Sequence, residues 1–234
     1  MARFGRLPAD ANAAGNRSEV DIMSIIRAVI VAGFLISACA YAEQQNDLRE
    51  FRVGMPISAL PESGYAAFAC ASDPAKKLSG WGGHQTCPAH ADGTRAISFR
   101  YGNGGSPEDD DGGKTQVGGQ PVNLALLIAK NGPGDGLVAG IRVDTDSHAR
   151  LYMHKKAYLF ALQVRARFGE DGWTCQKAAP TPTEQPVGGV FVHEHCEKAT
   201  ASRHFILDRQ LFRDPAKDLR DFTDATQLTI LRPG

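Results

Sequence analysis

The stretch VNLALLIAKNGPGDGLVAGIRV, residues 122–143, contains two apolar segments separated by a turn sequence. Within residues 122–129 and 137–143, apolar side chains recur with a period of two in places, which is typical of β-strands. The segment between them, Asn-Gly-Pro-Gly-Asp-Gly at residues 131–136, has the composition of a hairpin loop. The sequence therefore predicts two neighbouring strands joined by a turn.

Strand patterns continue on both sides of this hairpin. Residues 95–101 alternate in the same way, and shorter strands are predicted at residues 173–176, 190–197, 203–208 and 227–231. Strands outnumber helical segments, which favours an antiparallel sheet with few helices. The predicted fold class is α+β, an antiparallel sheet packed by one long and one short helix.

The long helix is predicted at residues 147–168. Six apolar residues share one face at helical spacing: Met153, Ala157, Phe160, Ala161, Val164 and Phe168. Asp146 or Ser147 can cap its start, and Gly169 occupies a helix-terminating position. The short helix is expected after Pro56, a residue that suits a first helical turn.

Residues 102–120 predict an exposed loop, because they are rich in glycine and contain four consecutive acidic residues at 108–111. A calcium loop places its acidic ligands at alternating positions, and here they are contiguous. The loop divides the chain into residues 43–101 and residues 121–234. These are expected to be two helix-plus-sheet units or one continuous domain.

Residues 43–234 contain four cysteines, which occur at similar positions in the two halves of the chain. In each half a Gly-aromatic pair is followed by two cysteines and then by an Arg that opens a strand. We interpret this pattern as a diverged duplication, which favours the disulfides Cys70–Cys87 and Cys175–Cys196 over the two other connectivities. Loops of this size should each stabilise the fold by about 3 kcal/mol.

The N-terminal region is predicted to be an export signal. Residues 1–22 are interpreted as an upstream extension, and residues 23–42 as a signal peptide that ends in Ala40-Tyr41-Ala42. The uncharged run at residues 28–42 is shorter than the roughly 20 apolar residues that span a bilayer, so no transmembrane span is expected in the mature chain.

A second interpretation overlaps the first. The segment Ile36-Ser37-Ala38-Cys39 resembles a bacterial lipobox, whose cysteine would be lipidated. The predicted location is therefore periplasmic or secreted, with anchoring to a bacterial membrane through Cys39 as the alternative. An even number of cysteines after the signal peptide fits an oxidising compartment, where they can pair in disulfides.

The segment FVHEHCEK, residues 191–198, offers the clearest candidate ligands. On a strand, His193, His195 and Glu197 would share one face, and Cys196 would point to the other. Imidazole and carboxylate groups suit zinc or copper(II), and His204 on the next strand is a further ligand candidate. The alternative is an exposed strand face without a metal.

Trp81 lies among glycines, where it is either a contact residue for a partner or part of the core. No nucleophile, phosphate-loop or dinucleotide motif occurs in the mature chain, so neither catalysis nor a cofactor is expected. The 26 basic and 26 acidic residues balance, which gives no reason to expect a nucleic-acid partner.

The predicted function is an exported, disulfide-stabilised binding or envelope-associated protein with a protein or envelope partner. The alternative is a periplasmic protein that binds a transition metal through His193, His195 and His204.

Overall fold

The computed structural model describes residues 46–102, 115–131, 135–154 and 156–233, which belong to one compact unit. The predicted upstream extension, signal peptide and Cys39 lie outside the described residues, as does the acidic segment 108–111. None of the described helices is both long and apolar enough to cross a membrane.

Ten strands and four short helical segments make up the described chain. The strands are β1 (Tyr65–Cys70), β2 (Asp73–Lys77), β3 (Arg95–Tyr101), β4 (Gln116–Val117), β5 (Gln120–Asn131), β6 (Asp135–Thr145), β7 (Thr174–Lys177), β8 (Val192–Ala199), β9 (His204–Arg213) and β10 (Phe222–Leu231). The helical segments are the 3₁₀ turns η1 (Ile57–Ala59) and η2 (Trp81–Thr86) and the α-helices α2 (Leu151–His154) and α3 (Ala157–Phe168).

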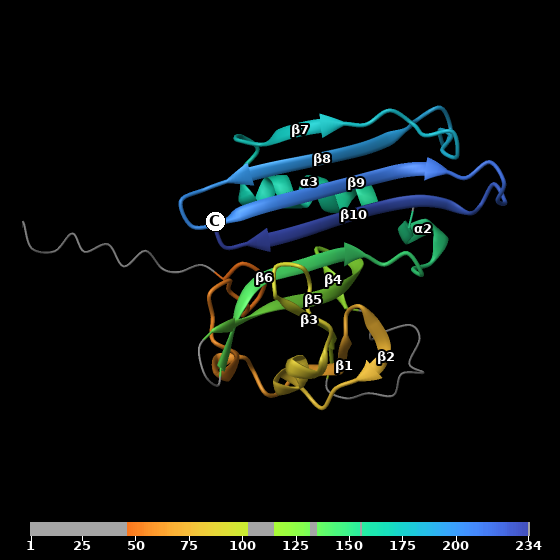
Figure 1. Ribbon diagram of the computed structural model, residues 1–234. Helices are drawn as coiled ribbons and strands as arrows, with labels where there is room; N and C mark the ends of the chain where they lie inside the picture. Colours follow the sequence, from red (N-terminus) through yellow and green to blue (C-terminus); the bar gives the residue numbers. More distant parts are fainter. Residues whose placement is uncertain (1–45, 103–114, 132–134, 155, 234) are drawn as a thin grey trace, which may run out of the picture. The chain divides into compact units, whose positions relative to one another are not determined.

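The strands form one antiparallel sheet in the order β2-β1-β3-β5-β6-β10-β9-β8-β7, and β4 pairs with β5 (Figure 1). The hairpin predicted from residues 122–143 is the β5–β6 pair near the middle of this order, with Leu124 opposite Val143. The prediction of a mostly antiparallel sheet with few helices is confirmed. Strands from both halves of the sequence join the same sheet.

The predicted helices are shorter than expected. The long helix is divided into α2 and α3, and it begins at Leu151 because Asp146 accepts a hydrogen bond from the His148 amide (2.9 Å), which holds the preceding residues in a turn. The short helix is the single turn η1. Leu60 precedes Pro61 and is extended (ψ 142°), since proline disfavours a helical conformation in the residue before it.

The predicted loop at residues 102–120 is also shorter than expected at its C-terminal end. Gln116 and Val117 pair with Pro121 and Gln120 across a two-residue turn. That turn consists of Gly118 (φ 58°) and Gly119 (φ 77°), which occupy the left-handed region that such hairpin turns require. β4 therefore extends the sheet where sequence composition indicated only a loop.

One face of the sheet carries the large buried apolar side chains that its central strands contribute. They come from neighbouring strands and are Ile97 and Phe99 (β3), Leu124, Leu126 and Ile128 (β5), Val138, Ile141 and Val143 (β6), Leu228 and Ile230 (β10), Phe205 and Leu207 (β9), and Cys196 (β8). The strand registers place these residues side by side, so the apolar surface is continuous. It must be covered to exclude water.

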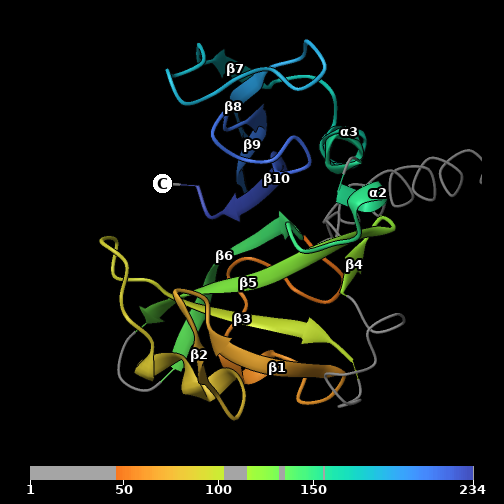
Figure 2. The same cartoon turned by 90° about the vertical axis from the view of Figure 1, so that its right-hand side faces the viewer.

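Two covers close this face, the first made of two segments and the second of one. Residues 48–60 and η2 cover the part formed by β3, β5 and β6, where the Gly54 amide bonds the Val138 carbonyl (2.7 Å). Helix α3 covers the part formed by β9 and β10, and it lies against one side of these strands (Figure 2). Thr226 of β10 fixes the start of α3 by donating a hydrogen bond from Oγ1 to the Ala157 carbonyl (3.0 Å).

Trp81 belongs to the first cover and not to a partner surface. Its side chain is only 7% exposed, and its ring contacts Phe51 (5.7 Å between ring centroids), Phe68 (4.6 Å) and Phe99 (4.9 Å). Its indole Nε1 donates a hydrogen bond to the Pro61 carbonyl (2.8 Å). The structure thus places Trp81 in the core, which was one of the two alternatives for this residue.

The disulfides join Cys70 to Cys87 and Cys175 to Cys196, the two pairs that the cysteine spacing favours. Cys175 and Cys196 lie directly opposite each other on β7 and β8. Cys70 ends β1, but Cys87 follows η2 and lies outside the strands, so the two halves differ at this point. The duplication stays a hypothesis.

Candidate functional site

Two sites in the described residues could carry a function: a histidine–carboxylate cluster on the open face of the sheet, and an apolar cavity on the covered face. The cluster contains His195 and Glu197 from β8 with His204 and Asp208 from β9. These side chains lie opposite to Cys196, as the strand alternation predicts, because successive side chains of a strand point to opposite faces.

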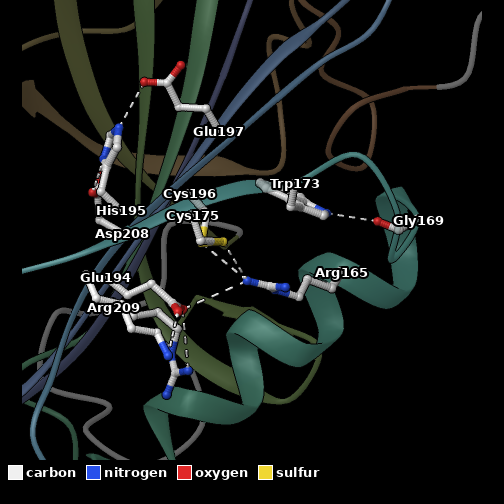
Figure 3. Close-up of a disulfide and its surroundings, with 11 residues drawn as sticks. Arg165, Gly169, Trp173, Cys175, Glu194, His195, Cys196, Glu197, Asp208 and Arg209 are labelled. Carbon is white, nitrogen blue, oxygen red and sulfur yellow. Dashed lines mark hydrogen bonds and ion pairs between the residues drawn. A yellow bond between two sulfur atoms is a disulfide. The ribbon is translucent and has the colours of Figure 1, made fainter.

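The cluster is a chain of hydrogen bonds. His195 contacts Asp208 through Nδ1 (2.6 Å to Oδ1) and Glu197 through Nε2 (3.0 Å to Oε1). His204 contacts the second oxygen of Glu197 through Nε2 (3.1 Å to Oε2). Figure 3 shows His195 between its two carboxylates. Sequence reasoning missed Asp208, because only the register of β8 against β9 places it opposite His195.

His193 does not join the cluster. It lies near Glu184 (3.9 Å between Nδ1 and Oε1), and its ring is near those of Phe191 (6.5 Å between centroids) and Phe212 (6.3 Å). The three histidines singled out in the sequence are thus brought together only as the pair His195 and His204.

The contacts of His195 favour its protonated form. A carboxylate only accepts hydrogen bonds, so the contacts with Glu197 and Asp208 both require an N–H on the imidazole. The hydrogen bond with Glu197, followed by that with Asp208, raises the pKa of His195 above its usual value. The hydrogen bonds from His195 and then His204 lower the pKa of Glu197. Both shifts favour the state in which His195 is protonated and Glu197 is ionised.

A shallow polar hollow of about 490 Å³ lies over the cluster, lined by Gly172, Thr174, Gln176, His195, Glu197, Ala199 and His204. The two imidazoles approach Glu197 from opposite sides, since His204 pairs with Ala199, four residues along β8 from His195. At about 3.3 Å per residue this is roughly 13 Å of strand. Both imidazoles reach toward the carboxylate between them, and each contacts a different oxygen.

Among the described residues, one group of three potential metal ligands has its atoms within 4.8 Å of one another: Cys175, Glu194 and Cys196. Its two sulfurs are joined in a disulfide, so no thiolate is present to bind a metal. Arg165 of α3 donates to both sulfurs (3.3 Å each) and lies 3.9 Å from Glu194 (Figure 3).

Glu194 lies on the covered face of β8, an unexpected place for an acidic residue. Three cations surround its carboxylate: Arg165 (3.9 Å), Lys177 (3.9 Å) and Arg209 (4.0 Å). Glu194 is only 12% exposed, and a charge in such a place needs partners of opposite sign. These ion pairs link α3, β7, β8 and β9 next to the apolar surface.

The second site is an apolar cavity of about 330 Å³ where the two covers of the sheet meet. Its floor is formed by Val143, Leu228 and Ile230 of the sheet, and α3 forms one wall. The remaining lining residues are Asp47, Leu48, Val117, Gly118, Phe160, Gln163, Val164, Arg167 and Phe168. The lining residues together come from five separate parts of the chain, which is why sequence reasoning missed the cavity.

The mouth of the cavity is polar. Gln163 is exposed and donates a hydrogen bond from Nε2 to the Gly118 carbonyl (2.8 Å), which ties the β4–β5 turn to α3. Arg167 is exposed and donates from Nη2 to the carbonyls of Asn46 (3.2 Å) and Asp47 (3.4 Å), which ties the N-terminal segment to α3. The cavity therefore has an apolar interior and a hydrogen-bonded rim.

A scan against protein-family models found no match, and searches of curated proteins and of solved structures found no significant similarity.

The cluster gives a prediction for pH dependence. The raised pKa of His195 means that its contribution to the free energy of unfolding is fully present below the usual value of 6.5 and is lost as the pH rises through the folded-state pKa. The lowered pKa of Glu197 gives a contribution that is present above 4.5 and is lost as the pH falls through its folded-state pKa.

The Asp208→Asn substitution removes a carboxylate that raises the pKa of His195. It should therefore lower this pKa, as measured by NMR titration of the imidazole. Asp221→Asn, in the exposed turn between β9 and β10, is the matched control and should leave that titration unchanged. An unaltered His195 titration in the Asp208 variant would contradict the network.

Proposed function

We propose that the protein is an exported, disulfide-stabilised binding protein that takes a small amphipathic molecule into the cavity between α3 and the sheet. The observation that carries this proposal is the cavity itself: about 330 Å³ of apolar space that opens at a polar rim. Ligand sites of proteins are commonly concave, largely apolar and about 300–1,000 Å³ in volume.

The position of the cavity supports a binding role. A gap in a core loses packing contacts and destabilises the fold by an amount that grows with its volume. Here the gap lies between buried residues, since Val143, Phe160 and Ile230 are each at most 2% exposed. An apolar ligand would restore the missing contacts.

The disulfides support the exported part of the proposal, because disulfides persist in oxidising compartments. Residues 23–42 would act as the signal peptide, which leads to a periplasmic or secreted protein or, through Cys39, to a lipid-anchored one. In each case the protein would bind its ligand or an envelope partner without transforming it.

Binding of N-phenylnaphthylamine, a dye whose fluorescence rises in apolar surroundings, tests the cavity. Val164 lines the cavity and is 3% exposed, so Val164→Phe should fill it and abolish the fluorescence increase. Leu162 lies on the outer face of the same helix and is 55% exposed, so Leu162→Phe should bind the dye as the wild type does.

Near-ultraviolet circular dichroism shows whether each variant keeps its packed core. The cavity is refuted as a ligand site if the wild type does not bind the dye. It is also refuted if the wild type and a folded Val164→Phe variant bind the dye equally.

A divalent metal at the histidine–carboxylate cluster is the second candidate function. The observation that favours it is the Asp208 contact with Nδ1 of His195, which leaves Nε2 directed at Glu197. Metal-ligating histidines commonly have their second nitrogen bonded to a carboxylate in this way. Zn²⁺ would take the place of the Nε2 protons of His195 and His204. The Glu197 carboxylate would then bind the same metal ion.

Calorimetric titration of chelator-treated protein with Zn²⁺ tests this second function. The metal should bind the wild type and His193→Ala equally, and His195→Ala should lose binding. No heat in the wild type, or equal loss in both variants, would exclude the cluster as a metal site.

A further inference from the structure

We infer that the ligand of the cavity is a single-chain amphiphile with an anionic head group, such as a medium-chain carboxylate, and that Arg167 recognises the head group. This inference rests on the proposed function and adds the chemical class of the ligand. It is based on the balance of charge at the cavity mouth.

The only acidic residue among the lining residues is already neutralised. Asp47 accepts hydrogen bonds on both carboxylate oxygens: Oδ1 from Nε of Arg203 (2.7 Å) and Oδ2 from the Val53 amide (2.7 Å). Its side chain is 7% exposed. A buried carboxylate paired in this way has little capacity left to attract a cationic ligand.

The charge of Arg167 is not neutralised in the same way. Within the described residues, Arg167 forms no ion pair with an acidic side chain, and its hydrogen bonds there run from Nη2 to two backbone carbonyls. A guanidinium has five N–H donors, so Nε and Nη1 keep theirs for a ligand. The neighbouring Arg165, in contrast, is committed to Glu194 and the disulfide.

The two parts of the site therefore match the two parts of an anionic amphiphile. An acyl chain would lie on Val143, Leu228 and Ile230 beneath α3, and a carboxylate at the rim would accept hydrogen bonds from Arg167. Charge-assisted hydrogen bonds from arginine to a carboxylate are among the stronger polar contacts in proteins. A neutral head group would gain less, and a cationic one would be repelled.

Isothermal titration with decanoate and decyl phosphate below their micellar concentrations, and with decanol below its solubility limit, tests this inference. Wild-type protein should bind both anions more tightly than decanol, by about tenfold or more, as expected when a hydrogen bond to a charged group is gained. A preference for decanoate over decyl phosphate identifies a carboxylate as the head group; the reverse preference overturns the carboxylate assignment.

Arg167→Gln should remove the preference for anions, so that decanoate and decyl phosphate bind this variant no more tightly than decanol does. The decanol titration of the same variant shows whether its cavity is intact. Arg167→Lys should restore part of the preference, because it restores the charge. Arg220→Gln, in the exposed turn between β9 and β10, is the control and should bind like the wild type.

The two proposals fail in distinguishable ways. Equal affinity for decanoate and decanol, unaltered in Arg167→Gln, would overturn the role of Arg167 and leave the binding function standing. Absence of binding for all three compounds would overturn the binding function itself.

Discussion

Buried side chains of neighbouring strands, from Ile97 on β3 to Cys196 on β8, form one apolar surface from which water must be excluded. In the part of the chain that the structure describes, no single element covers that surface alone. Residues 48–60 with η2 close one part through the aromatic residues around Phe51, and α3 closes the other. The cavity lies where these two covers meet, so the candidate ligand site follows from the way the sheet is covered.

Polar contacts hold helix α3 along its margins. Arg167 and Gln163 tie α3 to the N-terminal segment and to the β4–β5 turn, and Arg165 ties it to Glu194 and the disulfide. Helix α3 is therefore held at its edges and over the disulfide, while its contact with the sheet above Val143 and Leu228 is incomplete. Such an arrangement can hold a ligand without unfolding the cover.

Much of the sheet could be predicted from the sequence, because strand alternation is a local signal. The pattern in residues 122–143 identified the central hairpin, and alternation in residues 191–198 placed His195 and Cys196 on opposite faces. Properties that depend on distant residues could not be predicted. The pairing of His195 with Asp208 needs the β8–β9 register, and the cavity forms only where five separate segments of the chain meet. The break between α2 and α3 was hidden because the apolar periodicity continues through it.

Xenon binding to crystals of the protein tests the central claim most directly, because apolar cavities in proteins admit xenon. Anomalous density should appear between α3 and the sheet, in contact with Val143, Phe160, Val164 and Leu228. An electron-density map in which side chains fill this space, with no xenon beneath α3, would contradict the account.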